Sequence, residues 1–369
     1  MNSVLTRYKR LTTIGAVAIA GTILLSSCAA NEGDTTTDPT ATASTLAGTI
    51  DGAGSSAQGS AQEAWIAKFQ TANPDVTINY DPSGSGAGRE AFLSGGVSFA
   101  GTDSSLKPEE IDGGFKACAP DTGYIQVPNY ISPIAVIFNV EGVDKLNLDA
   151  ATLAGIFKGT ITTWNDPAIA ALNADAKLPS APITAVHRSD DSGTTKNFTD
   201  YLNKVAPDVW DAPAADPFPY QTGEAAQGTS GVVDAVTNGT NTIGYADASK
   251  AGKLGVAAIK VGDKFVNYSP EAAAAVVDAS PAGDTASATD LVIKLDRKTT
   301  DPTHYPLVLV SYIITCTEFV DAEVAPAVKA YVQYMTGEAG QAEAAASAGA
   351  APLSTELSAK IATALDSIK

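Results

Sequence analysis

Strand-like and helix-like stretches alternate along most of this chain of 369 residues. Residues 49–51 read as a strand, and residues 57–71 follow with the apolar spacing of a helix. Residues 76–80 and 183–187 again alternate as strands between helical patterns. Alternation of this kind predicts an α/β fold in which mainly parallel sheets are flanked by helices. The chain is also long enough for two domains.

Three segments far apart in the sequence combine glycines with small hydroxyl residues where a strand should end and a helix begin. They are residues 51–56 (DGAGSS), 83–89 (SGSGAGR) and 188–195 (RSDDSGTT). Glycine lets backbone N–H groups approach a ligand, and a helix start adds unpaired donors and a positive dipole end. One such junction is common, but three of them, one with an arginine, predict a single enclosed anion site.

The N-terminal segment predicts export. Arg7, Lys9 and Arg10 precede an apolar run over residues 12–25 that is too short to span a membrane comfortably, and Leu-Ser-Ser leads to Cys28. This resembles the lipobox of bacterial lipoproteins, which implies a signal peptide over residues 1–27 and acylation of Cys28. An uncleaved anchor or chance is the alternative.

The residues after the cysteine are rich in Thr, Ala, Asp and Gly and predict a flexible tether, so that 28–47 is the lipidated cysteine plus its tether. The expected location is the extracytoplasmic face of a bacterial cell membrane, with the lipid as the sole anchor.

Charge limits the partners. The formal net charge of −18 becomes −21 when the three basic residues of the leader are removed. This acidity argues against nucleic acid or an anionic membrane surface as a partner. It also means that long-range attraction will not bring an anion to the protein, so local hydrogen bonds must hold it.

Two cysteines remain besides Cys28. In an extracytoplasmic protein Cys118 and Cys316 are expected to form a disulfide, although two buried free thiols are the alternative. If they pair, the C-terminal part must lie against the N-terminal part and the first domain is discontinuous. Two lobes that the chain crosses more than once suit ligand capture by hinge closure.

Taken in order, the lipobox and the three segments resemble the phosphate-binding lipoproteins of the phosphate-specific ABC importer, the PstS family. Residues 99–103 (FAGTD) and 156–168 (IFKGTITTWNDPA) add to this resemblance, which runs from about Leu46 to the C-terminus. It implies a two-lobed class II periplasmic-binding-protein fold. The expected lobes are lobe I, residues 48–132 plus 306–369, and lobe II, residues 133–305.

The resemblance also implies a set of phosphate-binding residues, carried over position by position. They are Ser55, Ser56, Ser85, Asp103, Arg188, Asp190, Ser192, Gly193 and Thr194. Asp190 matches the acidic residue that holds the arginine in this family. Two departures concern affinity more than ligand identity: Ser56 stands where a threonine is frequent, and the second segment has a glycine at a common serine position.

The chemistry of Arg188 and of residues 192–194 supports such a site. The guanidinium presents a planar fork of donors that matches two phosphate oxygens. The alternative is a surface arginine or a simple ion pair with Asp190 or Asp191. Residues 192–194 would offer N–H groups and hydroxyls to an anion, or they form an ordinary helix N-cap without a ligand.

Asp103 leads to the most specific hypothesis, which concerns the selectivity of the site for phosphate over sulfate. A carboxylate facing an anion is repulsive unless the ligand donates a proton to it, and phosphate near neutral pH still carries at least one. Sulfate carries none, so two acceptors would face each other in a buried site, at a cost of several kcal/mol. The alternative is that Asp103 only caps a turn before Ser104 and Ser105.

Two enzyme classes are weaker interpretations. A dinucleotide site is compatible with the pattern Gly52-x-Gly54-x-x-Ala57, because the next strand ends in Tyr80-Asp81, near the place of a ribose-binding acid. Export argues against a nicotinamide cofactor. A secreted phosphatase or hydrolase could use Ser55, Ser85 or Ser192 as nucleophile, with His187 or His304 as base. No nucleophile elbow surrounds these serines, and no Cys/His cluster indicates a metal.

The expected function is therefore high-affinity binding of inorganic phosphate and its delivery to the permease and ATPase complex of an ABC importer. We expect a monomer without catalytic residues, cofactor or metal. A third interpretation keeps the fold and changes the ligand to molybdate, sulfate or a phosphonate, but Asp103 with Arg188 favours a protonated tetrahedral anion.

Overall fold

A computed structural model gives the fold and describes residues 44–284 and 287–369. The predictions for the basic leader, for residues 1–27 and for Cys28 lie outside the described residues. Among the helices of the described ranges, none combines the length and the hydrophobicity that crossing a membrane requires.

In the part of the chain that the structure describes, nine strands form one mixed sheet, in the order β2-β1-β3-β12-β4-β8-β6-β7 with β9 beside β4. These strands are β1 (Gly48–Gly54), β2 (Val76–Asp81), β3 (Phe99–Thr102), β4 (Tyr124–Asn139), β6 (Thr184–Arg188), β7 (Glu224–Ala226), β8 (Thr242–Asp247), β9 (Gly255–Val256) and β12 (Val308–Cys316). A second sheet has the order β11-β10-β5. Its strands are β5 (Asn147–Leu148), β10 (Ala258–Val261) and β11 (Lys264–Val266).

Helices occupy the connections between most strands. They are α1 (Gly59–Ala72), α2 (Ser85–Leu93), α3 (Pro108–Asp112), α4 (Ala150–Lys158), α5 (Pro167–Leu172), α6 (Gly193–Val205), α7 (Gly228–Asn238), α8 (Pro270–Asp278), α9 (Ala325–Thr336), α10 (Glu338–Ala348) and α11 (Thr355–Leu365). Two short 3-10 helices are Ala248–Lys250 and Ala322–Val324.

The predicted α/β character is confirmed, and the sheet has a parallel part on each side. β1 pairs in parallel with β2 and β3, and β6 pairs in parallel with β7 and β8. The strands between these parts are antiparallel, since β12 pairs with β3 and β4, and β4 pairs with β8. The fold is therefore two-lobed, with two α/β lobes connected by antiparallel central strands.

β4 is the strand that passes from one lobe to the other. It pairs with β12 as far as Pro133 and with β8 from Ile134 onward. Its 16 residues are buried except at the two ends, and residues 133–138 form a continuous apolar run. Both faces of such a strand must be covered, and helices cover them.

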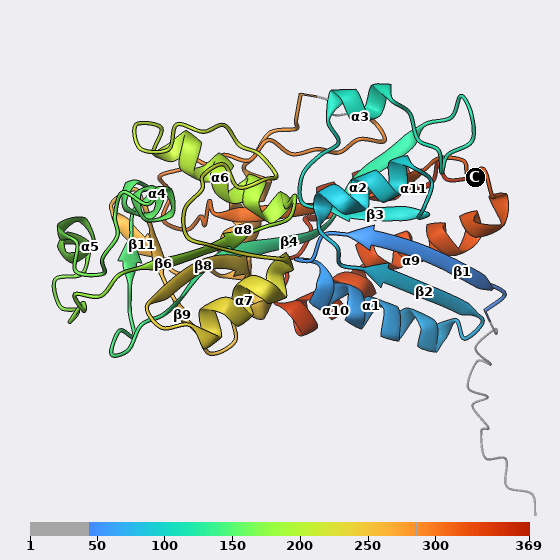
Figure 1. Cartoon of the computed structure of the whole chain (residues 1–369). Helices are drawn as coiled ribbons and strands as arrows, with labels where there is room; N and C mark the ends of the chain where they lie inside the picture. The colour runs from blue at the N-terminus through green and yellow to red at the C-terminus, as the bar shows by residue number, and fades with distance from the viewer. Residues whose placement is uncertain (1–43, 285–286) are drawn as a thin grey trace, which may run out of the picture. The chain divides into compact units, whose positions relative to one another are not determined.

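Figure 1 shows how the helices flank the sheet. Helix α2 lies on one side of β1 and β3, and α1 and α10 lie on the other side. In the second lobe, α6 and α7 flank β6 and β8 from opposite sides. Helix α2 begins after the carboxyl end of β2, and α6 begins after that of β6. Gly86 N donates to Asp191 O at 3.0 Å, so the two helix N-termini lie close together and can face one ligand.

The predicted disulfide is confirmed. The Sγ atoms of Cys118 and Cys316 are bonded at 2.04 Å, across a separation of 198 residues. This bond joins the segment before β4 to the end of β12. The C-terminal part of the chain therefore lies against the N-terminal part at this bond.

One buried acid should make stability depend on pH. Asp247, at the end of β8, accepts hydrogen bonds from Tyr130 Oη at 3.0 Å and from Ser249 N at 3.0 Å. Burial nevertheless raises the pKa of Asp247 to about 6. Because the folded pKa lies above that of an exposed Asp, this group stabilises the fold at low pH and loses that contribution as pH rises from about 4 to about 6.

We therefore expect Asp247→Asn to gain stability relative to the unmodified protein as pH rises through this window, by about 2–3 kcal/mol. The amide can still accept from Tyr130 and Ser249. Urea unfolding at several pH values between 4 and 7.5 measures the difference. A difference that stays constant over this range would mean that Asp247 does not titrate there.

Candidate anion-binding site

The structure brings the three glycine- and hydroxyl-rich segments together between the two parallel parts of the sheet. Ser55 and Ser56 directly follow β1, Asp103 follows β3, and the third segment continues from the end of β6. β6 runs in the opposite direction to β1 and β3, so the carboxyl ends of the two parallel parts face each other, and loops at such ends form the binding crevice. The N–H of Ser55 donates to Gly101 O at 2.8 Å, which holds the first loop against β3.

Asp103 is the point where these segments meet. Its Oδ1 accepts a hydrogen bond from Ser311 Oγ at 2.6 Å, and its Oδ2 accepts one from Thr194 Oγ1 at 3.0 Å. Its backbone N–H donates to Ser85 Oγ at 3.1 Å. The carboxylate is buried and bonds side chains from other elements, so its role is more than that of a local turn cap.

Burial raises the pKa of Asp103, although the hydroxyls of Ser311, Ser55 and Thr194 and the charge of Arg188 act in the opposite direction. A buried carboxylate that accepts bonds from neutral hydroxyls keeps acceptor capacity for one more donor. A proton-bearing anion can supply that donor.

Arg188 is held by Asp190. Its Nε donates to Asp190 Oδ1 at 2.7 Å, and its Nη2 donates to Asp190 Oδ2. Gly228 N also donates to Asp190 Oδ1, at 3.0 Å. Burial would raise the pKa of Asp190, but its bonds with Arg188 and Gly228 hold that pKa below its usual value. The ion pair orients the guanidinium and leaves Nη1 outside it.

The start of α6 supplies backbone donors. Ser192 is the N-cap, and its Oγ accepts from Thr195 N at 3.2 Å, so the expected capping role is present. Gly193 has no room for a side chain, because a Cβ there would lie 2.7 Å from Asp103 Cβ and 2.7 Å from Ser85 Oγ. This close approach places the first turn of α6, with its free N–H groups, directly against Asp103 and Ser85.

The first segment contributes in two ways. Ser55 is buried, its Oγ accepts from Ala57 N at 3.1 Å, and its hydroxyl stabilises the Asp103 carboxylate. Ser56 instead contacts the start of α7, where its Oγ accepts from Thr229 N at 3.0 Å. The candidates therefore divide into a group around Asp103, a pair formed by Arg188 and Asp190, and Ser56 at α7.

Sequence reasoning missed several residues of the site. Asn197 Nδ2 donates to Asp103 O at 2.7 Å and to Gly193 O at 2.9 Å, and Tyr245 Oη bonds Thr195 Oγ1 at 2.7 Å. Ser311 and Thr229 were missed as well. Ser311 had a detectable signal, because it interrupts the apolar run of β12 with a small hydroxyl.

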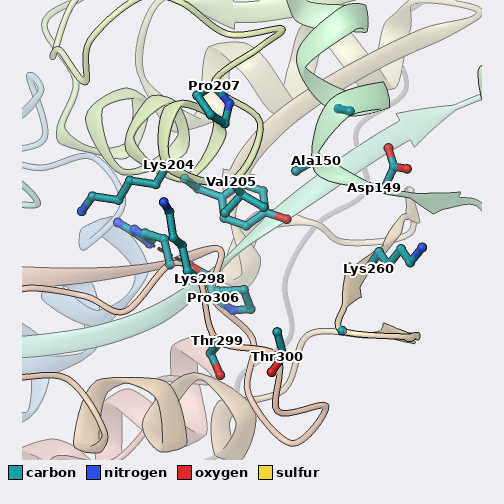
Figure 2. Close-up of a pocket in the computed structure, with 14 residues that line it drawn as sticks. Asp149, Ala150, Lys204, Val205, Pro207, Lys260, Lys298, Thr299, Thr300 and Pro306 are labelled. Atoms are coloured by element: carbon teal, nitrogen blue, oxygen red, sulfur yellow. Dashed lines mark hydrogen bonds between the residues drawn. The ribbon is translucent and has the colours of Figure 1, made fainter.

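A separate pocket of about 590 Å³ lies beside Arg297 and contains none of the predicted site residues. Figure 2 shows that the side chains of Lys204 and Lys260 in this pocket extend in opposite directions. The donors of Arg297 bond Asp200, Asn197 and the carbonyls of Pro306 and Val308. Lys204 and Lys260 therefore do not converge on one anion, and the donors of Arg297 are already bonded within the protein.

The fold and the buried polar site define a two-lobed binding protein, and residues 39–339 match the family model of the PBP superfamily domain. Similar proteins of known name identify the family within this class of binding proteins. The chain is 35% identical over 331 residues to "Phosphate-binding protein PstS 3" of Mycobacterium leprae, covering 87% of each chain. It is 34% identical over 368 residues to "Phosphate-binding protein PstS 3" of Mycobacterium tuberculosis, covering 96% of this chain and 97% of the relative. The chain belongs to the PstS family, whose members are binding proteins and not enzymes.

Solved structures share the fold at lower identity. A high-affinity periplasmic phosphate-binding protein bound with phosphate, PfluDING, aligns with a TM-score of 0.68 and 22% identity, over 85% of this chain and 93% of that one. A phosphate-binding protein from Stenotrophomonas maltophilia aligns with a TM-score of 0.63 and 19% identity, over 86% of this chain and 94% of that one.

Proposed function

We propose that the protein binds inorganic phosphate outside the cytoplasm and delivers it to the permease and ATPase complex of an ABC importer. The observation that carries this proposal is the buried carboxylate of Asp103 in the same site as Arg188 and the start of α6. A fully deprotonated anion would meet repulsion from this carboxylate, whereas a protonated phosphate can donate a hydrogen bond to it.

The proposed ligand contacts divide by chemistry. Arg188 supplies charged donors, and the start of α6 supplies the N–H groups of Gly193 and Thr194 and the hydroxyl of Ser192. Ser55, Ser56 and Ser85 add hydroxyl or backbone donors, and Asp190 holds the arginine without contacting the ligand. Hydrogen bonds to a charged group contribute roughly 1.5–3 kcal/mol each, so several of them can offset the desolvation of a small anion without a lysine.

The proposed lobes are residues 48–132 plus 306–369 and residues 133–305. The change of partner along β4 after Pro133 supports the first boundary. Within the second range, Asp290 lies against the first lobe, where its Oδ1 accepts from Gln126 Nε2 at 2.7 Å. Gly86 N donates to Asp191 O at 3.0 Å between the lobes, as expected for a closed form that traps its ligand.

We further propose that the protein is a monomer anchored at the extracytoplasmic face of the membrane through acylated Cys28. The lipobox pattern before Cys28 and the polar residues of the following tether support this anchoring. The tether would let the binding unit reach the permease while staying near the membrane.

Titration of the ligand-stripped protein with inorganic phosphate tests the function. We expect saturable binding by calorimetry and a thermal midpoint that rises with phosphate concentration, since a ligand that binds only the folded state stabilises it. Sulfate, molybdate and a phosphonate serve as competitors. A thermal midpoint that does not move with phosphate, or that moves more with a competitor, would reject phosphate as the ligand.

A further inference from the structure

One buried ion pair joins the two proposed lobes. Arg89 on α2 donates from Nη2 to Oδ2 of Asp216, at 2.8 Å, and the two side chains are 2% and 1% exposed. Asp216 lies in the loop between α6 and β7. Within residues 44–284 and 287–369, no other ion pair joins the chain before Pro133 to residues 134–305.

The remaining donors of Arg89 bond only to its own lobe. Nε donates to Glu110 Oε1 at 3.1 Å, and Nη1 donates to Thr102 Oγ1 at 3.1 Å and to Ser104 Oγ at 2.7 Å. Thr102 and Ser104 are the two neighbours of Asp103 in the chain. The guanidinium is therefore positioned by the loop that carries Asp103, and one nitrogen reaches the other lobe.

Asp216 is correspondingly tied to the third segment. Its backbone oxygen accepts from Ser192 N at 3.0 Å, at the N-cap of α6. Its Oδ2 bonds Arg89, while its Oδ1 is buried and has no hydrogen-bond partner among the described residues. Burial would raise the pKa of Asp216, but the charges of Arg89 and Lys196 outweigh it and hold that pKa below its usual value. The carboxylate therefore stays charged and depends on Arg89 when it is buried.

We propose that Arg89 and Asp216 are positioning residues for ligand capture, which form their ion pair only when the lobes close. This inference rests on the proposed function, because it assigns the pair to closure around phosphate. Neither residue touches the ligand. The pair connects the loop of Asp103 to the N-cap of α6. Formation of the ion pair therefore brings the Asp103 loop and the start of α6 to the ligand at the same time.

The physical reason is the cost of burying charge. When the lobes part, Arg89 keeps Glu110, Thr102 and Ser104, and Asp216 regains water. When the lobes close in a variant without the Asp216 carboxylate, Nη2 of Arg89 is buried without its charged acceptor, which is unfavourable. Removing one partner should therefore disfavour the closed state and weaken ligand binding, although no ligand contact is lost.

The test compares Asp216→Asn and Asp216→Ala with Asp208→Asn, which removes one charge at an exposed position shortly after α6. Calorimetry should show that both Asp216 variants bind phosphate about tenfold or more weakly, whereas the Asp208 variant binds normally. The thermal midpoint with phosphate should fall, and the midpoint without phosphate should stay unchanged. An equal fall in both midpoints with unchanged affinity would assign the pair to fold stability alone and overturn the proposal.

Small-angle X-ray scattering separates this inference from the proposed function. If the unmodified protein binds phosphate, the Asp216 variants should need more phosphate to reach the compact form. If the scattering of the unmodified protein does not change with phosphate, the proposed function fails, and the inference fails with it. If phosphate compacts the unmodified protein and the Asp216 variants at the same concentration, the proposed function stands and the role of the pair is overturned.

Discussion

Replacing Arg188 by alanine should lower the affinity for inorganic phosphate by roughly two to three orders of magnitude. The side chain is buried and bonds Asp190 through two of its nitrogens, so truncation removes charged donors and also leaves the Asp190 carboxylate unpaired near the ligand. Losing one partner of such a buried pair typically costs about 2–5 kcal/mol. Isothermal titration calorimetry with phosphate measures the effect.

Two further variants identify the cause. Arg188→Lys keeps the charge but not the planar fork, so it should recover only part of the affinity. The double variant Arg188→Ala with Asp190→Ala removes the unpaired carboxylate and should bind better than Arg188→Ala alone. Unchanged phosphate affinity in Arg188→Ala, with an intact fold by circular dichroism, would remove Arg188 from the site.

Replacing Asp103 by asparagine should relax the rejection of sulfate by two or more orders of magnitude. In the unmodified protein the carboxylate has no proton to give, so a sulfate oxygen would face another acceptor. The amide of asparagine presents a donor at the same place, and its oxygen can still accept from Ser311 or Thr194. Sites that reject a ligand through an unpaired buried polar group reach discriminations of about 10⁴–10⁵.

Calorimetry with sulfate and with phosphate checks this expectation, and Asp191→Asn is the matched control. Asp191 lies in the third segment but is exposed. Burial raises the pKa of Asp103, so lowering the pH should protonate this carboxyl group in the unmodified protein. Sulfate should therefore compete better with phosphate as the pH falls, as it does in Asp103→Asn. If Asp103→Asn excludes sulfate as strictly as the unmodified protein does, Asp103 does not determine the selectivity for phosphate over sulfate.

Local patterns were sufficient for much of the site. The glycine and hydroxyl junctions predicted where the helices α2 and α6 begin, because backbone donors and N-caps are properties of a few consecutive residues. The alternation of elements predicted the α/β class for a similar reason. The resemblance to the family then added individual residues such as Asp103, whose importance no local pattern could establish.

Partners from distant elements were not predictable in this way. Ser311 reaches Asp103 only because β12 lies between β3 and β4, and that order is a property of the whole sheet. Thr229 meets Ser56 across a separation of 173 residues. A single sequence does not show which residues of distant elements come into contact. It could at most indicate that Ser311 is a hydroxyl residue inside an apolar strand.

By itself, the sequence determined the α/β alternation, the helix starts rich in N–H donors, the acidic charge and the pair of cysteines available for a bond. These features depend on residue type and short spacing. Only the tertiary structure decided which hydroxyls surround Asp103, that Asp190 rather than Asp191 holds Arg188, and that Arg89 reaches Asp216. Such choices follow from the packing of two lobes, where burial makes each charge depend on the partner that the fold brings to it.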